Sequence, residues 1–319
     1  MEFKDVPGYE QLAALDARAR DDRPVITTGF NGLDSLLHRG GFHAGTLVVL
    51  GGRMHTRKTT VMLNWVLNLL YEAVPVALIS LDESLPNYVS KLMSVMSREP
   101  SDWIEAEWDT PAVDELKAQY KGMAGNKLCM TVGARPTFDQ LTQVLENDTE
   151  HERPRVVFID YLTLLGRDKY AGQDTSRIPR LMEELQVWTT TQDVVTVALH
   201  QVGRMDDGHA NRRYHGSTPM TAESLRYGGE EQADVVLGTY RPALDLLGNM
   251  SKGVAESVYG NEFDEEKWSD AVERVRTHEK STYLQLLKNR PGVHLSQEGI
   301  ELVSPGESQF LTERRVDGS

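Results

Sequence analysis

The chain has 319 residues, of which 39% are hydrophobic and 26% charged, the proportions of a globular protein with a buried core. Its formal net charge of −14 argues against non-specific coating of nucleic acid, because phosphate contacts need local cation density. No stretch approaches 18 uncharged apolar residues, which excludes a membrane-spanning helix, and the single cysteine, Cys129, excludes an internal disulfide.

The N-terminal residues 1–24 are expected to form an arm that precedes the main domain, and their sequence does not have the pattern of a targeting signal. They lack the basic and then apolar order of a secretory signal, so we expect a cytoplasmic protein, in keeping with its one cysteine. Cys129 itself is expected to be a small buried apolar side chain on a strand. Within residues 1–24, a short amphipathic helix at residues 9–20 is expected either to fray or to pack on a neighbouring subunit.

Apolar runs then alternate with helical stretches along residues 25–305, which predicts an α/β domain whose mostly parallel sheet has helices on both faces. The expected strands are residues 46–50, 76–81, 128–132, 155–165, 194–199, 234–239 and 282–287. The expected helices include residues 58–71, with an apolar stripe, and one that begins at the capping box of Thr137 and Gln140.

Three segments depart from this alternation. Residues 203–220 are polar and rich in glycine, which indicates a mobile loop. Residues 242–280 form an acidic insert with helical periodicity near its end. Residues 306–319 are expected to be a disordered tail.

Residues 52–59 (GRMHTRKT), between an expected strand and an expected helix, fit the phosphate-loop pattern G-x-x-x-x-G-K-[ST] except at its second glycine, which is Arg57. Backbone N–H groups at the start of the helix would surround the phosphates, Lys58 would reach them, and the Thr59 hydroxyl would hold Mg²⁺. A side chain at the glycine position costs about 1–3 kcal/mol if the strained backbone is kept. Arg57 is expected either to add a cation to the phosphates or to occupy their place. The residues expected to bind ATP are Gly52, Arg57, Lys58, Thr59 and Thr60.

The segments before this loop resemble a known family. Residues 28–34 (TGFNGLD) and 40–45 (GGFHAG) resemble the start of the C-terminal ATPase domain of DnaB-family replicative DNA helicases. The resemblance extends over residues 28–303 except the acidic insert. It implies a RecA-like core, ATP and Mg²⁺ as cofactors, DNA as a partner, and a homo-oligomer, expected to be a hexameric ring. The family's separate primase-contacting domain has no room here, so primase recruitment is not expected, and a small replicon such as a phage would suit the chain.

Two acidic motifs also resemble the family. Residues 159–162 (IDYL) match its second nucleotide motif, which implies that Asp160 binds Mg²⁺. Residues 80–84 (SLDES) resemble S-L-E-M-S, in which the glutamate activates the attacking water. Asp82 takes that position with a carboxylate about 1 Å further back, a displacement that can cost about 10²-fold in rate. Glu83 is expected to substitute if the strand ends early, so the base is assigned to the pair.

Three further segments follow the family's order. Residues 198–204 (ALHQVGR) resemble A-L-S-Q-L-N-R, which implies that Gln201 couples the γ-phosphate to DNA loops. Residues 225–236 give the longest match, to L-R-E-S-G-x-I-E-Q-D-A-D-V-V. Residues 287–292 (LKNRPG) resemble the segment whose Lys and Arg reach the next subunit's nucleotide, so Lys288 and Arg290 are expected to act in trans.

Two loops carry the expected DNA contacts, because cations with an interleaved aromatic ring suit single-strand binding. The candidates are Arg204, Arg212, Arg213 and Tyr214 in the loop of residues 203–220, and Arg167 and Lys169 in an earlier loop.

Three functions stay open at this point. The first is a DNA helicase or translocase that hydrolyses ATP. The second is a metal-dependent, structure-specific DNA nuclease, in which Asp82, Glu83 and Asp160 cluster around divalent ions because Arg57 blocks the phosphates. The third is a non-catalytic DNA clamp with the acidic insert as a docking surface.

Overall fold

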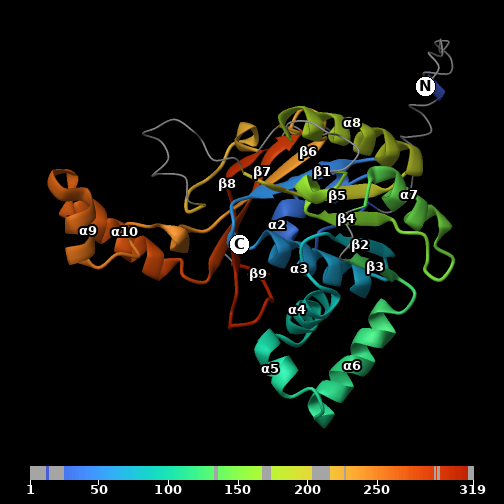
Figure 1. Ribbon diagram of the computed structural model, residues 1–319, viewed down its shortest axis with the longest axis horizontal. Helices are drawn as coiled ribbons and strands as arrows, with labels where there is room; N and C mark the ends of the chain where they lie inside the picture. The colour runs from blue at the N-terminus through green and yellow to red at the C-terminus, as the bar shows by residue number, and fades with distance from the viewer. Residues whose placement is uncertain are drawn as a thin grey trace.

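The computed structural model describes residues 12–13, 25–132, 136–166, 174–202, 216–225, 228–290, 292 and 295–314. Within these ranges the strands form one nine-stranded sheet in the order β3-β2-β4-β5-β1-β6-β7-β8-β9. The pairings among β1 to β6 are parallel, and those of β7, β8 and β9 are antiparallel. The predicted α/β class with a mostly parallel sheet is therefore confirmed (Figure 1).

The strands are β1 Leu47–Gly52, β2 Val76–Ser80, β3 Leu128–Val132, β4 Val156–Asp160, β5 Val195–Gln201, β6 Val235–Tyr240, β7 Ser281–Asn289, β8 Ser296–Val303 and β9 Thr312–Glu313. The helices are α2 Asn31–Asp34, α3 Lys58–Tyr71, α4 Leu85–Ser97, α5 Ser101–Ala106, α6 Pro111–Ala124, α7 Phe138–Asn147, α8 Asp174–Gln192, α9 Lys252–Tyr259 and α10 Glu265–Thr277. Among the helices described, none is long and apolar enough to cross a membrane.

The two faces of the sheet carry separate cores, because successive side chains of a strand point to opposite faces. In β1, Val48 and Leu50 pack with α3 and α4, whereas Leu47 and Val49 pack with α7 and α8. Figure 1 shows α3 and α4 on one side of the sheet and α7 and α8 on the other. A strand covered on both faces can be apolar throughout, which is why β1 and its parallel neighbours read as continuous apolar runs.

Most expected elements are found close to their expected bounds. The helix α3 and the strand β3 begin and end where the sequence predicted, and α7 begins after the predicted capping box, in which Thr137 and Gln140 bond each other's backbone N–H. The expected strand at residues 155–165 is shorter, because β4 ends at Asp160 and a 3₁₀ turn follows. The strand expected at residues 282–287 is present as β7, but it runs antiparallel to β6.

The acidic insert folds into the short helices α9 and α10, which lie away from the sheet in Figure 1. Trp268 of α10 donates its indole N–H to the Met250 backbone carbonyl at 3.0 Å, and Asp264 caps the first turn of α10 through the Lys267 N–H. These contacts are local to the insert, and the first ties α10 to the segment that precedes α9. The arm predicted at residues 9–20 lies outside the described residues except for residues 12–13, which are helical.

The expectation of a disordered tail from residue 306 is wrong for residues 306–314. Here β9 pairs with β8, and Leu311 is only 4% exposed within the core on the α3 side. Asn64 of α3 binds both sides of this segment, since its Nδ2 donates to the Gln309 carbonyl at 2.8 Å and its Oδ1 accepts from the Leu311 N–H at 2.9 Å. The two neighbouring apolar residues, Phe310 and Leu311, are too few to give a periodic signal, so the sequence did not predict this contact.

We expect Leu311→Ala to lower the free energy of unfolding by about 2–5 kcal/mol, because it removes a buried side chain and leaves a cavity. Urea unfolding followed by far-UV circular dichroism measures the change. Val187→Ala is the matched control, since Val187 is 51% exposed on α8 and its truncation should cost within about 0.5 kcal/mol. Equal stabilities for the two variants would mean that the C-terminal segment does not pack on α3.

Candidate nucleotide-binding site

The phosphate-loop segment joins the end of β1 to the start of α3 through a close approach at Gly52. A Cβ at Gly52 would lie 2.3 Å from the Thr239 hydroxyl oxygen and 2.6 Å from that of Thr56. These two hydroxyls are 2.8 Å apart and buried, and they tie the loop to β6. Only glycine therefore fits at the first position of the motif.

Arg57, at the second glycine position, keeps the backbone conformation that glycine would have. Its φ of 64° and ψ of 30° are left-handed, and it precedes α3 as the N-cap residue without a side-chain cap. Its Nη1 donates to the Lys280 backbone carbonyl at 3.3 Å, at the start of β7. Burial lowers the pKa of Arg57 from its usual range. The predicted backbone strain is present, and the guanidinium is bound to the protein backbone.

A second arginine lies beside Arg57. Arg241, which follows β6, donates from Nη1 to the His55 carbonyl at 3.3 Å and from Nη2 to the Glu279 carbonyl at 3.1 Å. Burial, and secondly the charge of Arg57, lower the pKa of Arg241 to about 10. The two arginines therefore connect the phosphate loop to both ends of the acidic insert, at Arg241 on one side and at Glu279 and Lys280 on the other.

Lys58 folds back over the loop. Its Nζ donates to the carbonyls of Gly52 and Arg53, each at 2.8 Å. Burial lowers the pKa of Lys58 to about 8, against the opposing effect of the Asp160 carboxylate. A buried ammonium held only by neutral carbonyls gains more from an anion than an exposed one does, because the local dielectric is low. The site thus favours an incoming phosphate.

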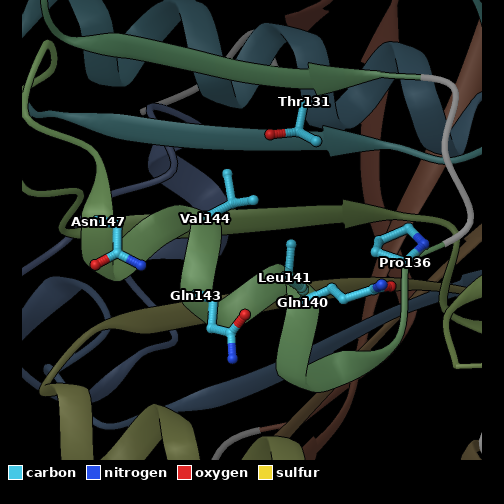
Figure 2. Close-up of a pocket in the computed structure, with 7 residues that line it drawn as sticks. All are labelled: Thr131, Pro136, Gln140, Leu141, Gln143, Val144 and Asn147. Carbon is cyan, nitrogen blue, oxygen red and sulfur yellow. The ribbon is translucent and has the colours of Figure 1, made fainter.

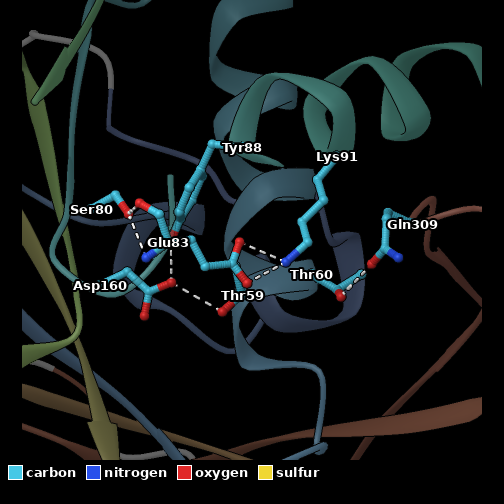
Figure 3. Close-up of polar contacts among 8 residues, drawn as sticks. All are labelled: Thr59, Thr60, Ser80, Glu83, Tyr88, Lys91, Asp160 and Gln309. Carbon is cyan, nitrogen blue, oxygen red and sulfur yellow. Dashed lines mark hydrogen bonds and ion pairs between the residues drawn. The ribbon is translucent and has the colours of Figure 1, made fainter. Parts of the chain in front are cut away.

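Thr59 and Asp160 meet at the carboxyl ends of β1 and β4, as predicted. The Thr59 hydroxyl donates to the Asp160 carboxylate at 3.0 Å, and the Tyr88 hydroxyl donates to the same oxygen (Figure 3). Burial raises the pKa of Asp160, while these hydrogen bonds and Lys58 lower it. A buried carboxylate beside a threonine hydroxyl is a pair of oxygen ligands of the kind that Mg²⁺ prefers. No described feature of the pair conflicts with such an ion.

The two acidic candidates for the base differ in their surroundings. Glu83 forms an ion pair with Lys91 of α4, and its backbone N–H and carbonyl both contact the Ser80 hydroxyl (Figure 3). Asp82 is exposed and forms no hydrogen bond or ion pair with any described residue. Because β2 ends at Ser80, both acids lie in the turn after the strand, but the ion pair with Lys91 engages the Glu83 carboxylate, so Asp82 is the unpaired acid of the two among the described residues.

The cluster of carboxylates required by the nuclease alternative is not found. Among the described residues, Asp82, Glu83 and Asp160 do not bring their oxygens within metal-sharing distance of one another. Glu83 is neutralised by Lys91, and Asp160 is engaged by Thr59 and Tyr88. This part of the sequence prediction is wrong, because strand-end acids were assumed to face a common point.

Two further candidates, Gln201 and Thr60, lie beside the phosphate loop and differ in whether their side chains are already bonded. Gln201, the last residue of β5, lies level with Gly52 of β1 in the parallel register and is half-buried. Thr60 uses its hydroxyl to bond the Gln309 side chain at 2.8 Å, so only its backbone N–H could meet a phosphate (Figure 3).

Lys288 and Arg290 lie at the level where β1 and β6 begin, whereas the phosphate loop follows the end of β1. Lys288 is in the antiparallel strand β7, opposite Val236 of β6, and Arg290 follows the end of β7, where its backbone N–H donates to the Asp234 carbonyl. In β1, which pairs with β6, about 13 Å of strand separates this level from the phosphate loop. Lys288 donates to the Glu230 and Glu231 carbonyls, and Arg290 pairs with Asp234 at 3.2 Å. Neither can reach its own chain's loop.

Sequence reasoning missed the side chains that hold the site residues in place. These are Thr56, Tyr88, Lys91, Thr239, Arg241 and Gln309. Except for Lys91, which pairs with Glu83 eight residues earlier, each belongs to an element distant in sequence from its partner, so no local spacing indicates it. The predicted DNA contacts Arg167, Lys169, Arg204, Arg212, Arg213 and Tyr214 lie outside the described residues.

The comparisons with known proteins point to one family. A family model described as DnaB-like helicase C terminal domain matches residues 25–294. The chain is 29% identical over 219 residues to a replicative DNA helicase DnaB of Helicobacter pylori (strain J99), covering 68% of this chain and 44% of that protein. It is 24% identical to a probable plasmid replicative DNA helicase of Chlamydia psittaci, covering 74% of this chain and 50% of that protein. The chain spans about half the length of the curated relatives it matches.

Two solved structures have the same fold. One, described as the ATPase domain of G40P, gives a TM-score of 0.71 at 19% identity, with 98% of this chain and 100% of that chain covered. The other, a DnaB-like replicative helicase described with its interactions with primase, gives 0.70 at 19% identity and covers 98% of this chain and 68% of that one.

Two substitutions at Arg57 test the backbone strain. Arg57→Gly and Arg57→Ala both remove the guanidinium and its bond to Lys280, and they differ only in the Cβ. At a left-handed φ of 64°, the Gly variant should be more stable than the Ala variant by about 1 kcal/mol. Chemical denaturation of the two proteins side by side measures this difference. An alanine variant of equal or higher stability would contradict the left-handed conformation.

Proposed function

Because the chain belongs to the family of DnaB-like helicase C-terminal domains, with a RecA-like α/β core, we propose that it is the motor domain of a DNA helicase or translocase that hydrolyses MgATP. The observation that carries this proposal is the meeting of Lys58, Thr59 and Asp160 at the uncapped N-terminus of α3. The same three groups are what a phosphate-binding loop needs: a cation, a hydroxyl and a metal-binding acid.

The triphosphate binds at the start of α3. The first N–H groups of a helix have no acceptor within it, and here no side chain caps them. Lys58 exchanges its two carbonyl acceptors for phosphate oxygens, which relieves the cost of its burial. Arg57 stays on the Lys280 carbonyl and leaves the loop open to the phosphates.

Thr59 and Asp160 hold the magnesium ion, which neutralises phosphate charge when bound. Asp160 stays ionised in that state because a divalent cation offsets the burial that raises its pKa. The Tyr88 hydroxyl, which donates to the same carboxylate, fixes its orientation. Thr59 would offer its hydroxyl oxygen to the ion, since that hydroxyl already lies 3.0 Å from the Asp160 carboxylate.

The attacking water is activated by the acidic pair after β2. Asp82 is exposed and unpaired among the described residues, so its carboxylate is available to accept a proton. Glu83, held by Lys91, lies close enough to Asp160 to act on its charge and orients the turn. Gln201, the last residue of β5 between β1 and β4, senses the terminal phosphate in this proposal.

Lys288 and Arg290 act in a neighbouring subunit. They lie at the edge of the sheet away from their own loop, on a segment fixed by Asp234 and the carbonyls of residues 230 and 231. Arg290 can stabilise transition-state charge from that position only if a second copy of the chain places its phosphate loop next to this arginine. The proposal therefore includes a homo-oligomer, a hexameric ring, with Arg167, Lys169, Arg204, Arg212, Arg213 and Tyr214 as its DNA contacts.

The test is phosphate release with MgATP, measured with and without single-stranded DNA, beside a labelled forked-DNA gel. We expect turnover that DNA stimulates, strands that separate without being cut, and a loss of turnover of at least about 100-fold in Lys58→Ala, because the phosphate charge is left unpaired. Lys267→Ala is the matched control, since that lysine lies on the exposed face of the insert and its loss should leave turnover unchanged.

Three results would count against the proposal. Turnover that persists in Lys58→Ala would place the chemistry elsewhere. DNA cut in Mg²⁺ without nucleotide would favour a nuclease. DNA binding with no turnover under any of these conditions would favour a clamp.

A further inference from the structure

A second group of chemically reactive side chains lies at the far edge of the sheet from β6 and β7. Cys129 is in β3, the edge strand, and Asp148 and His151 are in the loop between α7 and β4. One ligand-type atom from each residue lies within 4.8 Å of those of the other two, and all three residues are half-buried. None of these residues takes part in the nucleotide site, and Cys129 pairs with Ala77 in β2, three residues before the strand ends.

The loop is folded so that the three side chains converge. One carboxylate oxygen of Asp148 accepts from the backbone N–H groups of Glu150 at 3.0 Å and His151 at 3.1 Å. The His151 Nδ1 lies 2.9 Å from the other carboxylate oxygen. The Glu152 N–H donates to the Asn126 carbonyl at 2.8 Å, which fixes the loop to the segment that leads into β3. The backbone thus pre-organises the imidazole and the carboxylate beside the thiol.

The electrostatics exclude a nucleophilic role for the thiol. Burial, and then the hydrogen bond and charge of Asp148, raise the pKa of Cys129 to about 12, so the thiol stays protonated. The hydrogen bond from Cys129 is the main reason that the pKa of Asp148 falls to about 2. A catalytic cysteine needs the opposite, a nearby cation that favours the thiolate.

The cluster is open to solvent on one side. A hollow of about 440 Å³ is lined by Asp148 and His151 together with Glu152, Arg153 and Trp188. A second hollow, of about 530 Å³, is lined by Thr131 of β3 and by α7 residues that include Leu141 and Asn147. Figure 2 shows the residues that line it. Ions and water can therefore reach the cluster without unfolding of the sheet edge.

We propose that Cys129, Asp148 and His151 bind a thiophilic divalent cation of the Zn²⁺ class, with a water from the hollow as the fourth ligand. Thiolate sulfur, imidazole nitrogen and carboxylate oxygen are all zinc ligands, and in a tetrahedral site neighbouring ligand atoms lie about 3.5 Å apart. The present spacing needs side-chain shifts of about 1 Å or less to reach that geometry. Binding forms a metal–sulfur bond and releases the thiol proton to solvent, with no change of oxidation state.

The bound ion joins the edge strand to the loop after α7. It would stabilise β3 at the edge, where the strand has only β2 as a partner. This site is independent of nucleotide binding, so it stands or fails separately from the proposed motor function.

The test is a titration of the whole chain with Co²⁺, followed by absorption spectroscopy. Because the chain has one cysteine, a thiolate-to-cobalt charge-transfer band can arise only at Cys129. We expect the band to reach its plateau at one equivalent, to be displaced by Zn²⁺, and to disappear in Cys129→Ser. His151→Gln should weaken binding by at least about tenfold. His38→Gln, at an exposed histidine outside the cluster, is the matched control and should leave the band unchanged.

The stability of the metal-free protein shows whether His151→Gln has lost only a metal ligand or has also lost its fold. Thermal melting in EDTA should be similar for the wild type and His151→Gln, and Zn²⁺ should raise the melting temperature of the wild type by more than that of His151→Gln. A titration without the charge-transfer band would overturn the proposal. So would Zn²⁺ binding of equal strength in the wild type and in His151→Gln.

Discussion

The close junction between β1 and α3 is the constraint on which the rest of the structure depends. At Gly52 the buried hydroxyls of Thr56 and Thr239 leave no room for a side chain, so strand, loop and helix start can take only one path. That path aims the free N–H groups of α3 at one point and places Thr59 beside Asp160 of β4. The C-terminal segment then packs on the same helix through Asn64, which holds α3 in place behind the loop.

Arg57 shows how a motif can lose a glycine and keep its geometry. The left-handed conformation at this residue costs about 1 kcal/mol or more, and the surrounding structure imposes it because β1 and α3 are both buried in the core. The long side chain leaves the loop by bonding the Lys280 carbonyl beside Arg241. Arg57 and Arg241 thus bond the phosphate loop to the ends of the acidic insert. Any partner that moves the insert would therefore also act on the loop.

The sequence predicted what depends on local pattern. Apolar runs and helical periodicity located β1, α3 and β3, and motif order identified the family, which the family match over residues 25–294 confirms. Asp160 was found because an acid after a buried strand must lie at the sheet edge. Tyr88 was not found, because its bond to Asp160 arises only when α4 packs beside β4. The packed tail was missed because its polar contacts with α3 join residues more than 240 positions apart.

The central claim is that Arg57 leaves the phosphate loop open to ATP. The most direct measurement is the dissociation constant of a fluorescent ATP analogue with Mg²⁺, compared between the wild type and Arg57→Gly. We expect the two dissociation constants to lie within about threefold of each other, a difference in binding free energy of less than about 1 kcal/mol, because the guanidinium is bound to Lys280 and not to the site. A gain of tenfold or more in Arg57→Gly would show that Arg57 occupies the place of the phosphates. A loss of that size would show that it leaves Lys280 to bind them, and either result would contradict the account.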